Sequence, residues 1–557
     1  MKNIKIEKYW LTILLVLFFP AIWALFVPGF FGASDDIHIA WLFEMDRSLK
    51  SGQMPPRYVP DLSYGFGYPL FNFVFPLPFY VGEAFHLLGL SLVDSIKAVF
   101  LLATVLSGVF MYLLMKNLVK TTFLAILGSV LYVYAPYRAT DLYIRGAIGE
   151  IVAFAFLPLI ALSVLRVTEE KFDKKWLGFG GLAVAGLALS HNITTYMFLP
   201  FIFIFGVIRL VFLKSKDIKR LFSFLGIFLF GLLITLYFWL PALLESGLMK
   251  YDTVFDFRDH YPTLKQLITP YFGYGASVPG PYDGLSFFLG YAGVLLPILS
   301  LIYLIIKWRR VEKDKKIIYG WVVGSFLFII FLMNYRSTFL WFNLPLLGYF
   351  QFPWRFLIMT SFLTPIFLIV FDDLKFIKSL GLLLIIIVVG VSFSYFKPAD
   401  FLGRMDNYFL NRYIPYPEAS LEYGLLNEEY LRLPKENEMR PKSNYPTVFP
   451  ENSRVKEVIN LNSLDSLIKI ESEEEFLLNY NKYNFPGWVA EVDNKKIEIQ
   501  NGKPFSQIQV MLPAGIYNLH IYFKETFFRG LMNIVSLVSF LGVLIFLLRL
   551  YLSKNKL

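Results

Sequence analysis

Residues 10–41 read WLTILLVLFFPAIWALFVPGFFGASDDIHIAW. An apolar run of about twenty residues, long enough to cross the ~30 Å hydrocarbon core of a bilayer, leads directly into two adjacent aspartates. Asp35, Asp36 and His38 therefore lie at a predicted membrane border, where ionisable side chains are costly unless they have a partner or a function. This stretch predicts a membrane-spanning helix that delivers an acidic pair to one surface of the membrane.

The rest of the chain is similarly apolar. Of its 557 residues, 56% are hydrophobic and only 17% are charged, and the mean hydropathy is +0.56. A soluble protein of this size could not bury so much apolar surface, so the composition indicates a polytopic α-helical membrane protein. Cysteine is absent, which excludes disulfides, a thiol nucleophile and thiolate metal ligands. The net charge of +10 comes from short loops between apolar runs, which favours a membrane protein over a nucleic-acid-binding one.

The basic loops define an orientation. Segments such as KNLVK at 116–120 and KWRRVEKDKK at 307–316 fall on one side if the apolar segments alternate across the membrane. The positive-inside rule makes that side the cytoplasm, so a multi-pass plasma-membrane protein with both termini cytoplasmic is predicted. Cleavage of the first segment as a signal peptide is the alternative, because small residues follow it. The twelve predicted spans are 9–30, 94–115, 121–136, 149–166, 176–190, 194–213, 221–243, 286–306, 317–334, 352–371, 377–396 and 527–552.

This topology divides the chain into three parts. Residues 1–396 form a predicted transmembrane domain whose longer outer loops are 31–93 and 244–285. Residues 397–526 form an extracytoplasmic β-rich domain, and residues 527–557 form the last transmembrane helix and a cytoplasmic tail.

The β-rich prediction rests on period-two alternation of apolar residues. It is clearest in WVAEVDNKKIEI and YNLHIYF, and the turn-forming pairs Asp493-Asn494 and Asn501-Gly502 separate the runs. A small antiparallel β-sandwich in this place is more often a binding or covering module than a catalytic one.

The first outer loop begins with an amphipathic helix. In DDIHIAWLFEMDRSLKSG, helical spacing puts Ile37, Trp41 and either Phe43 or Met45 on one side. Asp35 or Ser34 is expected to cap the helix N-terminus, where the dipole favours negative charge. The following Gly/Pro/aromatic stretch at 64–89 is expected to be re-entrant or interfacial because prolines interrupt it.

These features together resemble one class of membrane enzyme. A first span, an outer loop that opens with an acidic pair, an amphipathic helix and a Gly/Pro/aromatic stretch resemble the C-class (GT-C) glycosyltransferases, which use lipid-linked sugar donors. The chain also resembles bacterial membrane proteins of the YfhO-like family, whose name, pyruvoyl-tetrahydropterin-synthase-related, suggests a different chemistry. The second resemblance rests on LSHNITTYMFLP at 189–200, YFQFPWRFL at 349–357 and NFPGWVAEVDNKKIEI at 484–499.

Several cationic and polar side chains at the outer ends of the spans are candidate contacts for a donor phosphate. Arg138 and Arg145 lie in a short outer loop where positive charge is unexpected, so they bind either phosphate or lipid headgroups. Arg355, near the outer end of its span, either contacts phosphate or extends to the headgroups. His191 and Asn192 form a polar pair at a helix end, with a substrate contact or a structural hydrogen bond as the alternatives.

The second outer loop adds a further candidate cluster. Arg258, Asp259 and His260 are consecutive, which suits either a pyrophosphate-binding site or an ordinary solvated loop. No Walker loop or Rossmann fingerprint occurs, and no cytoplasmic loop could hold a nucleotide-binding domain. No nucleotide cofactor is therefore expected.

The resemblance implies inverting glycosyl transfer from a polyprenyl-phosphate sugar to an extracytoplasmic glycan, lipid or protein. Asp36 is the predicted general base for the acceptor hydroxyl and Asp35 the second candidate, and such help accelerates transfer about 10²–10⁴-fold. Alternatively, the two carboxylates hold a divalent cation, Mg²⁺ or Mn²⁺, that neutralises the leaving phosphate. His38 would then ligate the metal or orient the acceptor.

Two other classes of function fit parts of the pattern. A multi-span transporter or lipid flippase would also have basic inner loops, but an internal repeat and midplane charges are typical of transporters and neither is evident. A scaffold that only anchors the β-rich domain would not need so many polar residues in the loops near the membrane.

Overall fold

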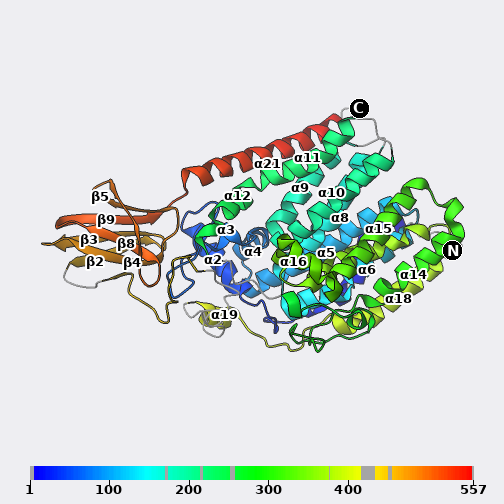
Figure 1. Ribbon diagram of the computed structural model, residues 1–557, viewed down its shortest axis with the longest axis horizontal. Coiled ribbons are helices and arrows are strands. Elements are labelled where there is room, and N and C mark those ends of the chain that lie inside the picture. The colour runs from blue at the N-terminus through cyan, green and yellow to red at the C-terminus, as the bar shows by residue number, and fades with distance from the viewer. Residues whose placement is uncertain are drawn as a thin grey trace.

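The computed structural model describes residues 6–169, 173–213, 218–250, 257–374, 377–414, 433–449 and 454–554. Helices form the main body, and the strands form a separate unit at one end of it (Figure 1). The last helix, α21 (Phe527–Lys554), leads from the β-unit back along the bundle and packs against α11, α12 and α9 (Figure 1).

The main helices of the bundle are α1 (Ile6–Ile22), α5 (Leu92–Leu118), α6 (Thr122–Val133), α8 (Ile148–Thr168), α9 (Lys175–Ser190), α10 (Asn192–Phe212), α11 (Ile218–Ile234), α12 (Leu236–Glu245), α14 (Gly290–Lys307), α15 (Lys313–Met333) and α18 (Ile377–Ser392). The other helices are α2 (His38–Lys50), α3 (Leu70–Phe73), α4 (Leu77–Leu87), α7 (Pro136–Ala139), α13 (Leu264–Ile268), α16 (Thr338–Asn343), α17 (Leu357–Leu363) and α19 (Asp406–Tyr413). The chain also forms the π-helical segment η2 (Thr140–Arg145) and the 3₁₀ helices η4 (Phe257–Asp259), η7 (Pro345–Phe350), η8 (Pro353–Phe356) and η9 (Thr364–Val370).

The polytopic helical class is confirmed, but the count of twelve full-length spans is not. Eight described helical segments are long and apolar enough to cross a membrane, or nine if α11 and α12, bent by 68°, make one span. Three other predicted spans contain only shorter apolar helices, at Thr122–Val133, Lys175–Ser190 and Leu380–Tyr395. At ~1.5 Å per residue, a twelve-residue helix such as α6 measures about 18 Å, too short to cross the bilayer core alone.

The predicted amphipathic helix is α2, and its predicted inner side is buried at Ile37, Trp41 and Met45. The predicted side-chain cap is wrong. Neither Ser34 nor Asp35 caps α2 with its side chain; the main-chain carbonyls of Asp35 and Asp36 accept hydrogen bonds from the amides of His38 and Ile39. Because the main chain supplies these acceptors, the Asp36 carboxylate is available for contacts outside the helix.

The Gly/Pro/aromatic stretch forms α3 and α4 instead of one long helix. Pro76 immediately precedes α4 and Pro78 lies in its first turn, where a missing N–H costs no hydrogen bond. The helix α4 packs against α2 and α5. Residues 73–75, between the two short helices, reach the wall of the cavity described below.

The β-rich prediction is confirmed from Val448 onward, whereas residues 406–413 of the predicted domain 397–526 form the helix α19. The strands are β1 (Val448–Phe449), β2 (Val455–Asn462), β3 (Asp465–Ser472), β4 (Phe476–Tyr483), β5 (Trp488–Val492), β6 (Lys495–Ile497), β7 (Gln500–Gly502), β8 (Gln507–Leu512) and β9 (Gly515–Phe523). They form two antiparallel sheets, β1-β4-β8-β7 and β2-β3-β9-β5-β6. Asp493 and Asn494, both at positive φ, make the predicted turn between β5 and β6.

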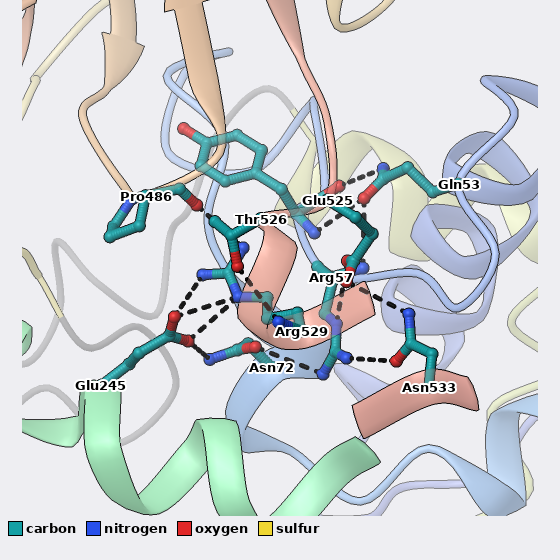
Figure 2. A network of polar contacts seen from close by, with 10 residues as sticks. Gln53, Arg57, Asn72, Glu245, Pro486, Glu525, Thr526, Arg529 and Asn533 are labelled. Carbon is teal, nitrogen blue, oxygen red and sulfur yellow. Dashed lines mark hydrogen bonds and ion pairs between the residues drawn. The ribbon is translucent and has the colours of Figure 1, made fainter. Parts of the chain in front are cut away.

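A buried polar network joins the β-unit to the helices (Figure 2). Arg529, at the start of α21, pairs with Glu245 at the end of α12 at 2.9 Å and donates a 2.8 Å hydrogen bond to the Pro486 carbonyl of the β-unit. Arg57, from the segment between α2 and α3, pairs with Glu525 at 3.1 Å. Both guanidinium groups are almost completely buried, so each needs its carboxylate partner.

Asn72 of α3 connects the two ion pairs (Figure 2). Its amide nitrogen donates to Glu245 at 2.8 Å, and its oxygen lies 3.4 Å from Nη1 of Arg57. Arg57 also donates to Asn533 of α21 at 2.9 Å. Four segments far apart in the sequence therefore share one set of hydrogen bonds.

Removing one charge from this network should destabilise the whole junction. We expect Glu245→Ala to lower the free energy of unfolding by about 3–5 kcal/mol, because it leaves the buried Arg529 unpaired. Lys456→Ala, which removes a half-exposed ion pair with Glu471 in the β-unit, should cost only about 0–1 kcal/mol. Apparent melting temperatures of the detergent-solubilised variants would compare them, and equal losses would contradict a special role for the network.

Candidate functional site

A cavity of about 1200 Å³ lies at the end of the helical body where α8 and α10 begin. Its wall is made by residues 32–38, the segment 73–75, the N-terminal ends of α8 and α10, the loop 274–277, residues 349–355 and residues from the segment 399–413. The N-terminal ends of α8 and α10 therefore lie at this cavity, where their helix dipoles favour the binding of an anion. The ionisable lining residues other than tyrosines are Asp35, Asp36, His38, Arg145, Glu150, His191, Arg355, Arg404 and Arg412.

Asp36 is held in the cavity wall by the segment around α19. Its Oδ1 accepts a hydrogen bond from the Tyr413 hydroxyl, and its Oδ2 lies 3.9 Å from Nη1 of Arg404. The residue is only 6% exposed. Burial raises the pKa of Asp36 above its usual value and Asp35 adds to the rise, whereas Tyr413, Arg412 and Arg404 oppose it. An aspartate in this setting is a stronger base than an exposed one.

Asp35 and His38 line the same cavity but make different contacts. The Asp35 side chain accepts a 3.3 Å hydrogen bond from the Ser34 hydroxyl, and its amide donates to the Arg145 carbonyl at 2.7 Å. Nδ1 of His38 lies 3.2 Å from the Gly146 carbonyl oxygen. Burial lowers the pKa of His38, so its imidazole is neutral at physiological pH.

The predicted metal site is not assembled by these three side chains. The carboxylate of Asp36 is engaged by Tyr413, and His38 directs Nδ1 at a main-chain carbonyl. Within the described ranges, no three His, Cys, Asp or Glu side chains approach closely enough to hold a metal ion. The Mg²⁺ or Mn²⁺ ion stays a prediction, and no chemical step below depends on it.

In the same cavity wall, two arginines lie beside one buried glutamate. Arg145 pairs with Glu150 at 2.5 Å and with Asp141 at 2.6 Å. The Nε atom of Arg355 lies 3.9 Å from Oε1 of Glu150. This buried Nε donates no hydrogen bond within the described part of the chain. Arg145 comes from the π-helical segment η2, which ends at Gly146 with φ +66°, a conformation that favours glycine. The two cations therefore lie together at the cavity wall.

His191 and Asn192 close the side of the cavity beside residues 73–75. Nδ1 of His191 is 2.8 Å from the Thr194 hydroxyl, and the imidazole contacts the ring of Phe75 edge to face. Asn192 donates a 3.2 Å hydrogen bond to the Phe73 carbonyl. Both residues line the cavity, as a substrate contact would require, and both also make structural contacts.

The structure does not bring three of the predicted residues to the cavity. Arg138 is fully buried between the rings of Phe154 and Tyr132, with its guanidinium carbon 4.6 Å from the Phe154 centroid. Arg258 and Asp259 are exposed on η4. The sequence showed that these positions carry charge. It did not show whether each side chain packs against aromatic rings, faces solvent or lines a cavity.

His260 lies directly behind the cavity wall. Its Nδ1 is 2.9 Å from the Ser277 hydroxyl and its ring contacts Phe352 edge to face, and both of those partners line the cavity. It therefore supports the wall and does not itself line it.

The lining residues that the sequence analysis did not single out include Glu150, Arg404, Arg412 and Tyr413. A carboxylate inside an apolar run, five residues after Arg145, was a usable signal for the first. No local spacing could reveal the other three, because they reach Asp36 from about 370 residues further along the chain.

Three comparisons relate the chain to known proteins. A protein 25% identical over 231 residues, uncharacterized, occurs in Lactococcus lactis subsp. cremoris strain MG1363; the match covers 40% of this chain and 37% of that protein. The cryo-electron-microscopy structure of the mycobacterial arabinofuranosyltransferase AftD covers 70% of this chain and 27% of its own, with a TM-score of 0.45 and 14% identity. A mutant of that enzyme gives 0.44 and 15%.

The chain thus spans well under half the length of these relatives, and a structural likeness at this level establishes no activity for it. A family model described as "6-pyruvoyl-tetrahydropterin synthase related domain; membrane protein" matches residues 71–398. Since this is more than half of the 557 residues, the chain belongs to the 6-pyruvoyl-tetrahydropterin synthase related family of membrane proteins.

Proposed function

We propose that the cavity is the active site of a membrane glycosyltransferase that moves a sugar from a polyprenyl-phosphate donor to an extracytoplasmic acceptor. One observation carries the proposal: a buried carboxylate, Asp36, and two clustered arginines, Arg145 and Arg355, line the same large cavity. Inverting transfer needs a base for the acceptor and cations for the leaving phosphate, and these are the groups present.

A lipid-linked donor is supported by the apolar surface that continues from the cavity. Tyr196 and Tyr349 line the cavity and are also exposed, at 38% and 66%. Beyond them, the outer side chains of α10, α16 and η7 are exposed and apolar, including Phe203, Phe339, Phe342 and Leu346. A prenyl chain in the bilayer could follow this surface while its sugar phosphate entered the cavity.

The positions of the basic loops support an extracytoplasmic cavity. At the opposite ends of the helices, Lys120 pairs with Glu312, Lys315 with Asp372, and Arg209 with Asp314. These residues lie in or beside the basic loops that the positive-inside rule assigns to the cytoplasm. The cavity, at the N-terminal ends of α8 and α10, would then face outward.

The reaction follows from the charges in the cavity. Asp36 accepts the proton of an acceptor hydroxyl, and that oxygen bonds to the anomeric carbon as the bond from this carbon to the phosphate oxygen breaks. The electron pair leaves with the polyprenyl phosphate, whose charge Arg145 and Arg355 stabilise. Nε of Arg355 is a buried donor already available for a phosphate oxygen.

A transporter is the second candidate, because the 68° break between α11 and α12 resembles the broken helices of transporters. The break, however, lies against the last helix, where the Tyr237 amide donates a 2.8 Å hydrogen bond to the Ser536 hydroxyl, and neither residue lines the cavity. Because the broken helix does not line the cavity, an enzyme with its active site at the membrane surface is favoured over a transporter.

Asp36→Asn should reduce transfer by about 10²–10⁴-fold, because an amide cannot accept the acceptor proton. Asp35→Asn, one residue away, should retain much more activity, since Asp35 is the second candidate. The assay would follow release of polyprenyl phosphate from radiolabelled polyprenyl-phosphate hexoses by protein in lipid vesicles, with water or a panel of glycans as acceptor. A folded and fully active Asp36→Asn variant would refute the base assignment.

Removing an arginine should weaken donor binding only if that arginine lines the cavity. Loss of a hydrogen bond to a charged group costs about 1.5–3 kcal/mol, so Arg355→Ala should weaken donor binding about 10- to 100-fold. Arg258→Ala, which removes an exposed arginine outside the cavity, is the matched control and should leave donor binding within about twofold. Direct binding of the labelled donor to vesicles would measure both, and equal losses would contradict a phosphate site at Arg355.

A further inference from the structure

The segment around α19 is brought onto the acidic pair from the far end of the chain. Its Tyr413 bonds to Asp36 across a separation of 377 residues, while Arg404 and Arg412 line the cavity beside it. We propose that α19 is part of the active site and that Tyr413 is a positioning residue that holds the Asp36 carboxylate for proton transfer. This inference rests on the proposed function.

Main-chain contacts fix the start of this segment against the first outer loop. The Phe30 amide donates to the Arg404 carbonyl at 2.7 Å, and the Arg404 amide donates back at 3.3 Å. A Cβ atom on Gly29 would lie 2.4 Å from the backbone of Gly403, so the approach is close enough to require glycine. The position of Arg404 is therefore set by the backbone and not by its own side chain.

The helix α19 is then tied to α5. The carboxylate of Asp406 accepts hydrogen bonds from the amides of Leu92 at 2.9 Å and Val93 at 3.0 Å, two donors at the start of α5. Phe409 is fully buried and contacts the ring of Phe30 edge to face. With one end and one face fixed, the helix delivers Tyr413 at its last turn to Asp36.

The hydrogen bond from Tyr413 puts the two carboxylate oxygens of Asp36 in different surroundings. Oδ1 is occupied by the Tyr413 hydroxyl, whereas Oδ2 accepts no hydrogen bond in the part of the chain that the structure describes. Its nearest cation is Arg404 at 3.9 Å. The guanidinium of Arg412 lies over the Tyr413 ring, 5.5 Å from its centroid. Such an arrangement fixes the carboxylate and keeps one oxygen available for an acceptor proton.

The same residues decide how readily Asp36 ionises. The charged and titratable groups that face it are Asp35 on its own segment and Arg404, Arg412 and Tyr413 on the α19 segment. Burial raises the pKa of Asp36 and Asp35 raises it further, while the three α19-segment residues lower it. Loss of the Tyr413 hydroxyl, or of one arginine, should therefore move the pKa of Asp36 to a higher value.

Carbodiimide labelling tests this without relying on catalysis, because the reagent attacks the protonated carboxyl group. The full chain in lipid vesicles would be treated with a water-soluble carbodiimide and an amine over a series of pH values, and labelling at Asp36 would be quantified by peptide fragmentation. For Tyr413→Phe, the pH at which labelling is half lost should shift upward. Arg404→Gln should shift it in the same direction and provides a second variant.

Tyr517→Phe is the matched control, since it removes a hydroxyl of β9 that donates a 2.7 Å hydrogen bond to the Pro513 carbonyl and does not line the cavity. Its labelling curve should coincide with that of the unaltered protein. Unshifted curves for folded Tyr413→Phe and Arg404→Gln, or equal shifts in all three variants, would overturn the inference. A shifted curve combined with full activity of Asp36→Asn would instead refute the proposed function and leave the contact standing.

Discussion

Two buried arginines, Arg57 and Arg529, constrain how the β-unit and the helices can fit together. Each guanidinium is removed from water, and the carboxylate beside it offsets part of the cost of burying the charge. The required carboxylates, Glu525 and Glu245, come from the segment after β9 and from the end of α12. Breaking such a buried ion pair is costly, although forming it adds little net stability. The main effect of the network is therefore to favour one arrangement of the β-unit against the helices.

The same constraint reaches the cavity through Asn72. This side chain bonds to Glu245 and lies one residue before the segment 73–75 that forms part of the cavity wall. The Phe73 carbonyl in that segment accepts the hydrogen bond from Asn192 at the start of α10. The position of the β-unit and the shape of the cavity are therefore set by consecutive contacts of one short stretch of chain.

Much of this architecture could be predicted from local sequence patterns, because hydropathy and period-two alternation depend on neighbouring residues. The apolar helices, the acidic pair after the first apolar run and the two-sheet unit were all accessible in this way. Positive charge at the ends of apolar runs pointed to Arg145 and Arg355, which line the cavity. The sequence did not reveal that three predicted spans contain only short helices. Hydropathy shows that a segment is apolar but does not show where a helix within it ends. Arg138 and Arg258 show the second limit: an arginine between two apolar runs can lie in an aromatic core or in solvent, and only tertiary contacts decide which.

The cavity has two halves of different origin. Arg145, Glu150 and Arg355 lie within residues 71–398, the part that matches the family model, whereas Asp36 and Tyr413 lie outside it on either side. Under the proposed function, the helical body supplies the cations for the leaving phosphate, and the flanking segments supply the base and its support. Main-chain hydrogen bonds hold these parts together: the Phe30 amide donates to the Arg404 carbonyl at 2.7 Å, and the Asp35 amide donates to the Arg145 carbonyl at 2.7 Å. Proton transfer and phosphate recognition would then be properties of separate parts of the chain that meet across one cavity.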